Sequence, residues 1–438
     1  MSAPPAARYR VAPGGSIAGT LSVPGDKSIS HRALMLGALA QGVTHISGFL
    51  AAEDCLATAR ALEGLGVRIE WPAPGEVRVH GAGVRGLTAA QAPLDLGNAG
   101  TAMRLMMGLL AAEPFESTLI GDASLMRRPM ERVAVPLRLM GAQILTQDGR
   151  PPVQVRGTHA LQAIEYALPV ASAQVKSAIL LAALRARGCT RLTEPAPSRD
   201  HTERMLRSFG VQVQQAGATI GLQGGQPLHA AALEVPADFS SAAFFVVAAC
   251  LAASEPLLIR NVGINPTRTG LLEILKAMGA DIRVHAPAVQ GPEPRADLEV
   301  RSSALRGIEV PEALVPLAID EFPVFFVAAA CASGETLVRG AQELRVKESD
   351  RLAAMAAGLT VLGIENRLLP DGLWLRGAGG FSGGTLDSHG DHRIAMAFAV
   401  AALRARAPIE ILDVANVATS FPGFLGTAQA AGLQISLA

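Results

Sequence analysis

Six long apolar segments, each opened by a polar residue, recur along the chain. Asp, Asn or Ser at such a position can cap a helix, and the runs that follow are apolar on every side. We therefore predict six buried helices, over residues 26–40, 98–112, 172–183, 238–253, 320–332 and 391–403.

A second pattern follows each apolar segment: an amphipathic segment ends at a glycine, and a short strand-like segment comes next. A glycine just beyond the last helical residue is typical of a helix end. The spacing predicts six βαβα-type units of about seventy residues, because the intervals are 75, 69, 69, 84 and 69 residues. The glycines are Gly66, Gly141, Gly210, Gly279, Gly363 and Gly432.

Six units of this kind fit two globular α/β halves of three units each. We predict a continuous domain over residues 25–237 and a discontinuous one made of residues 1–24 and 238–438. The hinge is expected near residues 24–25 and 236–238, with a site between the halves.

Composition narrows the class of protein. The 438 residues carry a formal net charge of +0, with 50% hydrophobic and 4% aromatic residues, which argues against a nucleic-acid partner. The runs 242–253 and 322–332 are too short to span a membrane, and residues 1–10 lack a signal core. Together with scattered cysteines that form no C-x-x-C pair, these features favour a cytoplasmic protein with buried free thiols and no metal site. The cysteines are Cys55, Cys189, Cys250 and Cys331.

Lysine is rare, and three of the four lysines lie in motifs. The total of 38 Lys and Arg leaves 38 − 4 = 34 arginines. Lys27, Ser28 and Arg32 cluster at the start of the first buried helix, where free N–H groups and the helix dipole favour an anion. The alternative is an ordinary capped helix with a solvated basic edge.

Two further motifs carry charge. On a helix, Lys347 and Arg351 share one face, with Glu348 beside them, after a strand-like segment at 343–346; a surface salt-bridged helix is the alternative. Asp320 caps the apolar helix that follows it, and it becomes a candidate base if that helix start faces the same cleft as the cations. His389 and His392 lack a third metal ligand, and the G-x-G-x-x-G match at 81–86 is not followed by a sufficient helix.

With these motifs assembled, the chain resembles the 5-enolpyruvylshikimate-3-phosphate (EPSP) synthase family over essentially its full length, and it is similar to the second class of that family. The matching stretches are 25–28, 97–101, 128–129, 172–176, 199–203, 265–268, 320–321, 347–351 and 391–393. The resemblance implies a monomer of two domains, each with three βαβαββ repeats and buried parallel helices, which closes on its substrates.

The resemblance also implies the reaction: transfer of the enolpyruvyl group of phosphoenolpyruvate to the 5-hydroxyl of shikimate 3-phosphate, without a cofactor. Asp320 would take the hydroxyl proton, and Glu348 and Lys27 would share the proton transfers at the methylene carbon and at the leaving phosphate. Shikimate 3-phosphate would contact Lys27, Ser28, Arg32, Ser172, Ala173, Gln174, Arg199, Asp320 and Lys347. Phosphoenolpyruvate would contact Lys27, Gly100, Arg128, Gln174, Arg351 and Arg393. Cations and helix N-termini suit two phosphates and two carboxylates.

Two positions bear on inhibitor binding. Many first-class members carry a lysine shortly before the C-terminal Phe-Pro, and the segment 416–422 has none. Gly100 stands where some glyphosate-tolerant relatives carry alanine, so we expect appreciable glyphosate sensitivity.

Three other functions compete with this reading. UDP-N-acetylglucosamine enolpyruvyl transferase uses a cysteine on the loop that here spans 121–129, and this loop contains none. RNA 3′-phosphate cyclase is disfavoured by the neutral charge. A hinged anion-binding protein without catalysis would explain the cations, but not the carboxylates of Asp320 and Glu348.

Overall fold

The computed structural model describes residues 7–83, 86–287 and 291–438, and the chain divides into two compact units. The inserted unit is Gly25–Val235. The split unit is Pro236–Ala438 together with the N-terminal segment that ends at Pro24. Residues 1–6 of the predicted discontinuous domain and residues 84–85 of the G-x-G-x-x-G match lie outside the described residues.

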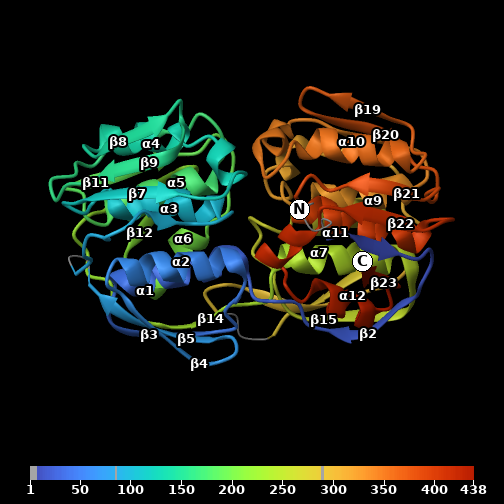
Figure 1. Ribbon diagram of the computed structural model, residues 1–438, viewed down its shortest axis with the longest axis horizontal. Helices are drawn as coiled ribbons and strands as arrows, with labels where there is room; N and C mark the ends of the chain where they lie inside the picture. Colours follow the sequence, from blue (N-terminus) through green and yellow to red (C-terminus); the bar gives the residue numbers. More distant parts are fainter. Residues whose placement is uncertain (1–6, 84–85, 288–290) are drawn as a thin grey trace, which may run out of the picture. The chain divides into compact units, whose positions relative to one another are not determined.

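The described residues of the inserted unit form three sheets and six α-helices (Figure 1). The sheets have the strand orders β14-β3-β5-β4, β6-β7-β9-β8 and β10-β11-β13-β12. In each, one parallel pair adjoins two antiparallel pairs. The helices are α1 (Lys27–Leu39), α2 (Glu53–Gly64), α3 (Gly100–Leu110), α4 (Glu131–Leu139), α5 (Ala173–Ala183) and α6 (His201–Ser208). The strands are β3 (Gln41–Ser47), β4 (Arg68–Ala73), β5 (Glu76–Ala82), β6 (Leu94–Asp95), β7 (Glu116–Ile120), β8 (Gln143–Gln147), β9 (Arg150–Arg156), β10 (Glu165–Ala167), β11 (Cys189–Thr193), β12 (Val213–Ala216), β13 (Thr219–Gln223) and β14 (Ala232–Glu234).

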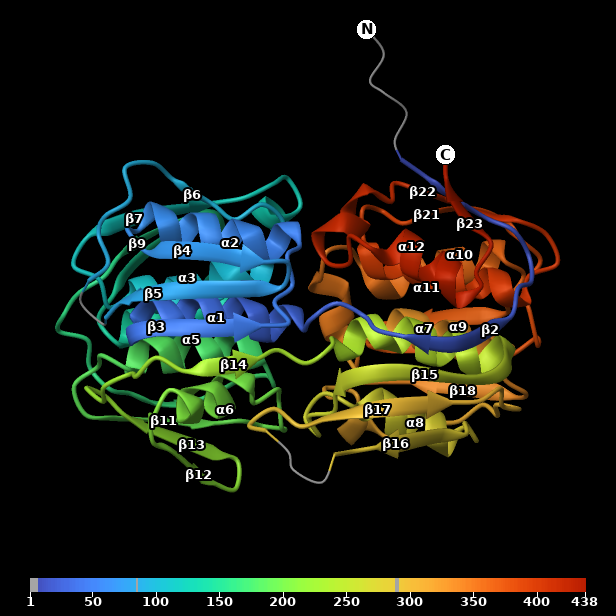
Figure 2. The same cartoon turned by 90° about the horizontal axis from the view of Figure 1, so that it is seen from below.

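Two sheets of the split unit, β16-β17-β15-β2 and β21-β22-β1-β23, repeat this plan, whereas the third, β18-β20-β19, has three strands and only antiparallel pairs. Figure 2 shows β2, drawn in blue, along β15, with which it pairs in parallel. The helices are α7 (Phe239–Ala252), α8 (Gly270–Ala277), α9 (Phe322–Cys331), α10 (Arg351–Val361), α11 (His392–Ala401) and α12 (Phe424–Ala431). The strands are β1 (Tyr9–Val11), β2 (Ile17–Leu21), β15 (Ala253–Gly263), β16 (Ile282–His285), β17 (Arg295–Val300), β18 (Glu335–Val338), β19 (Asn366–Leu369), β20 (Gly372–Arg376), β21 (Gly384–Asp387), β22 (Ile409–Leu412) and β23 (Ile435–Leu437). The predicted α/β class is confirmed.

The six buried helices are confirmed, and four of them begin at a polar side chain that caps the first turn. The side chains of Asp26, Ser172, Asp238 and Asp391 accept hydrogen bonds from backbone N–H groups of α1, α5, α7 and α11. Each such bond satisfies an N–H group that the helix itself leaves without a partner.

The predicted cap at Asp320 is wrong. Helix α9 begins at Phe322, its N-cap residue is Glu321, and no side chain caps it. The Asp320 carboxylate instead contacts two cations. It is therefore not used to hold the helix start.

The six glycines are confirmed as helix ends. All have positive φ, between 84° and 110°, a backbone region that glycine enters without steric cost. They follow α2, α4, α6, α8, α10 and α12. The sequence repeat is therefore a repeat of structure.

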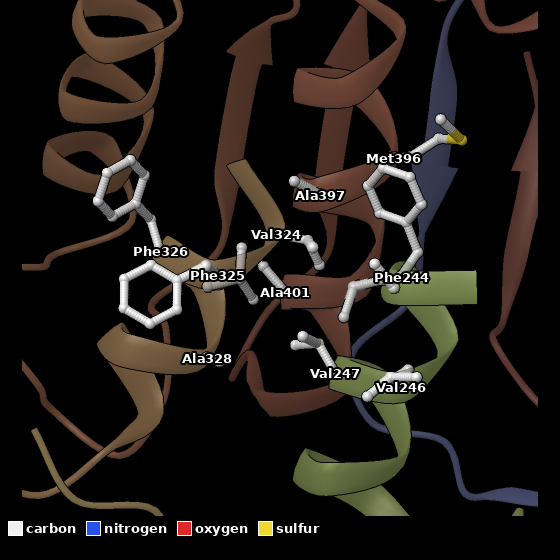
Figure 3. Packing of buried hydrophobic residues seen from close by; sticks show 14 of the residues in the cluster. Phe244, Val246, Val247, Val324, Phe325, Phe326, Ala328, Met396, Ala397 and Ala401 are labelled. Carbon is white, nitrogen blue, oxygen red and sulfur yellow. The ribbon is translucent and has the colours of Figure 1, made fainter. Parts of the chain in front are cut away.

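Helices α7, α9 and α11 pack together as the core of the split unit (Figure 3). Phe244 and Val247 of α7, Val324 and Phe325 of α9, and Ala397 of α11 are at most 2% exposed. Burying a phenylalanine contributes roughly 1.5–3 kcal/mol, so this packing stabilises the three helices against one another.

Two predictions about local structure are wrong. Residues 343–346 form part of the 3-10 helix η3 (Gln342–Val346), not a strand. Helix α10 begins only at Arg351, so Lys347 and Glu348 lie in the preceding loop and do not share a helix face with it. All four cysteines are free, but only Cys55 and Cys250 are fully buried.

Candidate functional site

The polar start of α1 carries Lys27, which forms an ion pair within the inserted unit. Lys27 Nζ lies 2.9 Å from Asp54 Oδ2, in the first turn of α2. Both side chains are largely buried, at 15% and 8% exposure. Asp54 therefore fixes the ammonium at the start of α1, where the helix dipole attracts an anion.

Arg32 lies one turn further along α1 and is buried. Its Nε donates to Thr202 Oγ1 and its Nη2 to Ser177 Oγ, both at 2.8 Å, and its Nη1 donates to the Ser28 carbonyl at 2.9 Å. These bonds tie the first turn of α1 to helices α5 and α6. Arg32 thus positions Ser28 as well as adding charge beneath it.

The start of α5 presents an amide held by two neighbours. Gln174 Oε1 accepts from Arg104 Nη1 at 2.5 Å, and Gln174 Nε2 donates to Thr101 Oγ1 at 2.8 Å. Ser172 is the N-cap residue and Ala173 the first residue of this helix. The starts of α3 and α5 are therefore joined through side chains.

Arg128, which follows the 3-10 helix η1 (Leu125–Arg127), lies against the start of α3. Its Nη2 donates to Asn98 Oδ1 and to Ser124 Oγ, at 2.5 and 3.3 Å. A Cβ at Gly100 would lie 2.8 Å from Arg128 Nη1, so only glycine leaves the guanidinium in this place. Arg199, half-buried, lies two residues before α6.

Lys176, although it belongs to a predicted motif, is 1% exposed. Its Nζ lies 2.9 Å from Glu194 Oε2 and 2.7 Å from Glu203 Oε1. Burial raises the pKa of the Glu203 carboxyl, although the charge of Lys176 opposes the shift. Lys176 is therefore part of a buried ion cluster.

His31 titrates far below its ordinary range. Burial, followed by the charges of Lys27 and Arg32, lowers its pKa from 6.5 to about 3. The unfolded chain binds a proton here below pH 6.5 and the folded chain does not, so stability falls as the pH drops from 6.5 towards 3. The slope is about 1.4 kcal/mol per pH unit.

We predict that His31→Asn removes this contribution to the pH dependence. Urea unfolding of both proteins at pH 7 and pH 5 should show the wild type losing about 2 kcal/mol more stability than the variant on acidification. The amide that replaces the imidazole retains a group that can bond Thr58 Oγ1, which lies 2.7 Å from His31 Nδ1. Equal losses in the two proteins would contradict the prediction.

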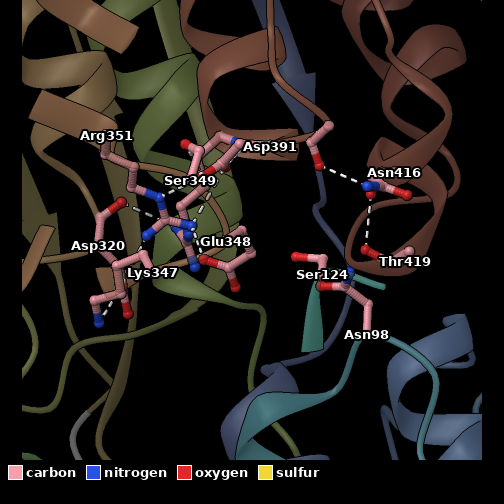
Figure 4. A network of polar contacts seen from close by, with 12 residues as sticks. Asn98, Ser124, Asp320, Lys347, Glu348, Ser349, Arg351, Asp391, Asn416 and Thr419 are labelled. Carbon is pink, nitrogen blue, oxygen red and sulfur yellow. Dashed lines mark hydrogen bonds and ion pairs between the residues drawn. The ribbon is translucent and has the colours of Figure 1, made fainter. Parts of the chain in front are cut away.

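Arg351, the first residue of α10, is the centre of the polar group in the split unit (Figure 4). Its Nε and Nη2 donate to Asp391 at 2.8 and 3.3 Å, its Nη1 to Asp320 at 3.2 Å and its Nη2 to Glu348 at 2.5 Å. Burial alone would lower its pKa, but the carboxylates of Asp391, Glu348 and Asp320 outweigh burial and raise it. The guanidinium therefore stays charged and holds three acids in fixed places.

Two more cations contact Asp320. Lys347 Nζ lies 3.2 Å from Asp320 Oδ1, and Arg393 Nη1 donates to the Asp320 carbonyl at 3.2 Å. Asp391, the N-cap residue of α11, accepts from the Arg393 N–H at 2.9 Å and from Ser349 Oγ at 3.1 Å. The predicted residues Asp320, Lys347, Glu348, Arg351 and Arg393 therefore form one cluster, with Asp320 between positive groups.

Sequence reasoning missed the roles of Asp54 and Asp391. Asp54 belongs to no motif that suggests chemistry, and Asp391, although it lies in the matching stretch 391–393, is given no role beyond the start of a helix. The first turn of α2 gave a weak signal, because two acids, Glu53 and Asp54, open that helix. Lys27, the partner of Asp54, and Arg351, the partner of Asp391, are distant from them in sequence, so only the fold reveals these two ion pairs.

Neither a metal site nor a membrane span emerges from the described residues. Within 7–83, 86–287 and 291–438, no three His, Cys, Asp or Glu side chains gather closely enough to hold a metal ion. No helix in the same ranges has the length and apolar character needed to cross a membrane.

Comparisons with known proteins agree on one family. Residues 11–427 match EPSP synthase (3-phosphoshikimate 1-carboxyvinyltransferase). The chain is 59% identical to the 3-phosphoshikimate 1-carboxyvinyltransferase of Methylococcus capsulatus over 98% of both chains, and 59% identical to that of Alkalilimnicola ehrlichii over 98% of this chain and 96% of the relative. It is also similar to a solved structure of EPSP synthase from Acinetobacter baumannii, with 51% identity, a TM-score of 0.88 and coverage of 99% and 100%.

Proposed function

The chain belongs to the EPSP synthase family. From this we propose that the polar residues at the starts of α1, α3 and α5 and the cluster around Arg351 carry out the family's reaction on the same pair of substrates. The enzyme transfers the enolpyruvyl group of phosphoenolpyruvate to shikimate 3-phosphate, a step of aromatic amino acid biosynthesis. The family match over residues 11–427 is the observation that carries the assignment.

Shikimate 3-phosphate is proposed to bind the starts of α1 and α5 together with the Asp320 cluster. Lys27 and Ser28 supply an ammonium and a hydroxyl at a helix N-terminus, a place suited to a phosphate. Arg32 supports Ser28 from beneath. The other proposed contacts are Ser172, Ala173, Gln174, Arg199, Asp320 and Lys347.

Phosphoenolpyruvate is proposed to bind Lys27, Gly100, Arg128, Gln174, Arg351 and Arg393. Arg351 already makes four hydrogen bonds to carboxylates. Its Nη1 carries two N–H groups but makes only one of these four bonds, to Asp320. We propose that Arg351 mainly orients Asp320 and Glu348 and offers its remaining N–H to the ligand. Arg128 and Arg393 then supply most of the binding charge.

The proposed reaction has two steps. In the first step, the oxygen of the 5-hydroxyl bonds to C2 of phosphoenolpyruvate while Asp320 accepts the hydroxyl proton. Glu348 or Lys27 protonates the methylene carbon, which gives a tetrahedral ketal. The C2–O bond to phosphate then breaks as a proton leaves the methyl group, which restores the double bond. Lys347 and Arg351 hold the Asp320 carboxylate in place, and positioning on closure near the expected hinge supplies much of the rate.

A phosphate-release assay tests the proposal. We expect phosphate to appear only when phosphoenolpyruvate and shikimate 3-phosphate are both present. Binding of both anions without release would instead support the non-catalytic alternative.

The finer properties are proposals as well. We propose a monomer in the cytoplasm, in keeping with four free thiols. Sedimentation of the purified chain tests the monomer, because a heavier species would contradict it.

We predict that glyphosate inhibits the enzyme in competition with phosphoenolpyruvate. Gly100 leaves the space beside Arg128 free of a side chain, as the 2.8 Å distance of an added Cβ from Arg128 Nη1 indicates. An inhibition curve that stays flat at glyphosate concentrations far above the KM for phosphoenolpyruvate would overturn this prediction.

A further inference from the structure

The repeat within the chain allows positions of the split unit to be compared with their counterparts in the inserted unit. Helices α5 and α11 are the third buried helices of the two units. After α5, the Arg187 N–H donates to the Leu161 carbonyl at 2.8 Å; after α11, the Arg406 N–H donates to the Phe381 carbonyl at 2.9 Å. These equivalent bonds fix the correspondence of the two segments.

Counting back two residues on each side pairs Arg185 with Arg404 and His159 with Gly379. The side-chain partners of Arg185 include an acid and a histidine. Its Nη1 forms a largely buried ion pair with Glu113, and its Nη2 lies 2.8 Å from His159 Nδ1. The arginine after α5 is therefore fully engaged within its own unit.

The counterpart of Glu113 is Ala332. In the inserted unit the Thr158 N–H donates to the Ala111 carbonyl at 3.0 Å, and in the split unit the Ala378 N–H donates to the Ala330 carbonyl at 2.9 Å. Glu113 and Ala332 each lie two residues after these acceptors. The split unit has thus replaced both the acid and the histidine by residues without polar side chains.

Arg404 is correspondingly exposed and weakly bound. Among the described residues, its guanidinium makes a single long hydrogen bond, from Nη2 to the Gly379 carbonyl at 3.4 Å. In the part of the chain that the structure describes, no carboxylate lies within ion-pair distance of it. Arg404 therefore lacks the carboxylate partner that its counterpart Arg185 has in Glu113.

A hollow of about 460 Å³ opens beside Arg404, a size within the usual range for small-molecule sites. Burial raises the pKa of the Cys331 thiol in its wall to about 12, despite the opposing charge of Arg404, so this thiol is an uncharged surface. The lining of the hollow includes the apolar residues Leu251, Leu305 and Cys331 and the polar residues Ser302, Ser333 and Arg404.

We propose that this hollow binds a small carboxylic acid with an apolar body, whose carboxylate takes the place beside Arg404 that Glu113 holds beside Arg185. The guanidinium fork matches a carboxylate with two parallel hydrogen bonds, and the Ser302 hydroxyl can donate to it as well. The apolar body would lie against Leu251 and Leu305.

The hollow is separate from the Asp320 cluster. Leu251 and Cys331 lie at the C-terminal ends of α7 and α9, and Arg404 follows α11, whereas Asp320 and Arg393 lie at the starts of α9 and α11. Helix α9 has 10 residues, which places the two ends about 15 Å apart.

Calorimetric titration of the full-length protein with benzoate tests the proposal. We expect saturable binding that weakens at least about tenfold in Arg404→Gln and for the neutral analogue benzamide. Arg406→Gln is the matched control, because Arg406 is also exposed, lies two residues away and does not line the hollow. It should bind benzoate within about twofold of the wild type.

Ala332→Glu supplies a second variant, which restores the internal acid of the other unit. If its Tm matches the wild type, it should bind benzoate as weakly as Arg404→Gln. The proposal is overturned by absence of binding up to about 10 mM benzoate, by equal affinity for benzamide, or by equal losses in Arg404→Gln and Arg406→Gln.

Discussion

Asp320→Ala is expected to lower turnover by at least about 100-fold while the protein stays folded. Asp320 is the proposed base, and loss of a general base lowers kcat roughly 100- to 10,000-fold. Arg351 retains Asp391 and Glu348 as partners, so the variant leaves no buried guanidinium unpaired. The measurement is phosphate release under saturating substrates, together with the Tm.

Two further variants make this result specific. Asp320→Asn keeps the shape of the side chain and should lose turnover to a similar extent, because an amide cannot accept the proton. Glu365→Gln removes an exposed carboxylate, paired with Arg376, from the same unit, and should leave kcat within about twofold. Near-normal turnover in Asp320→Ala would refute the role of this residue.

Gly100→Ala is expected to raise the KM for phosphoenolpyruvate by about tenfold or more, with a smaller change in kcat. The added Cβ would lie 2.8 Å from Arg128 Nη1 and 3.4 Å from Arg104 Nη1. A displaced Arg128 could not keep its hydrogen bond to Asn98 and bind phosphoenolpyruvate at the same time. The loss of one charge-assisted hydrogen bond costs roughly 1.5–3 kcal/mol, which accounts for the higher KM. The atoms that must move are the tips of flexible side chains, so the fold should persist.

Gly426→Ala is the matched control for this substitution. Gly426 lies inside α12, and an added Cβ would meet no atom within 4 Å. It should leave the KM unchanged and stabilise the helix by up to about 1 kcal/mol. A KM that is unchanged in Gly100→Ala as well would show that Arg128 does not bind this substrate in the observed position.

The sequence predicted the buried helices because the signal is local. A capping residue such as Asp26 lies next to the apolar run that it starts, and a glycine such as Gly432 adopts its positive φ at the end of the helix that it follows. The repeat multiplies each signal six times. Little tertiary information is needed to read such features.

The predictions failed where distant contacts decide the local structure. Asp320 lies at the start of an apolar helix, as a cap would, but Lys347 and Arg351 attract its carboxylate. The segment before Lys347 has a strand-like composition, yet Arg345 donates to carbonyls of residues 369 and 370 and to Asp350, and the segment curls into a 3-10 helix. The spacing of residues along the sequence does not predict these contacts.

The pairing of β1 between β22 and β23 also dictates an order of assembly during synthesis. Tyr9 of β1 is opposite Ile411 on one side and Leu437 on the other, so this strand has no neighbours until the last repeat leaves the ribosome. The inserted unit closes its three sheets with strands from within its own span and can fold as soon as residue 235 emerges. During synthesis, the inserted unit can therefore be folded while β1 is still unpaired, because β22 and β23 have not yet been made.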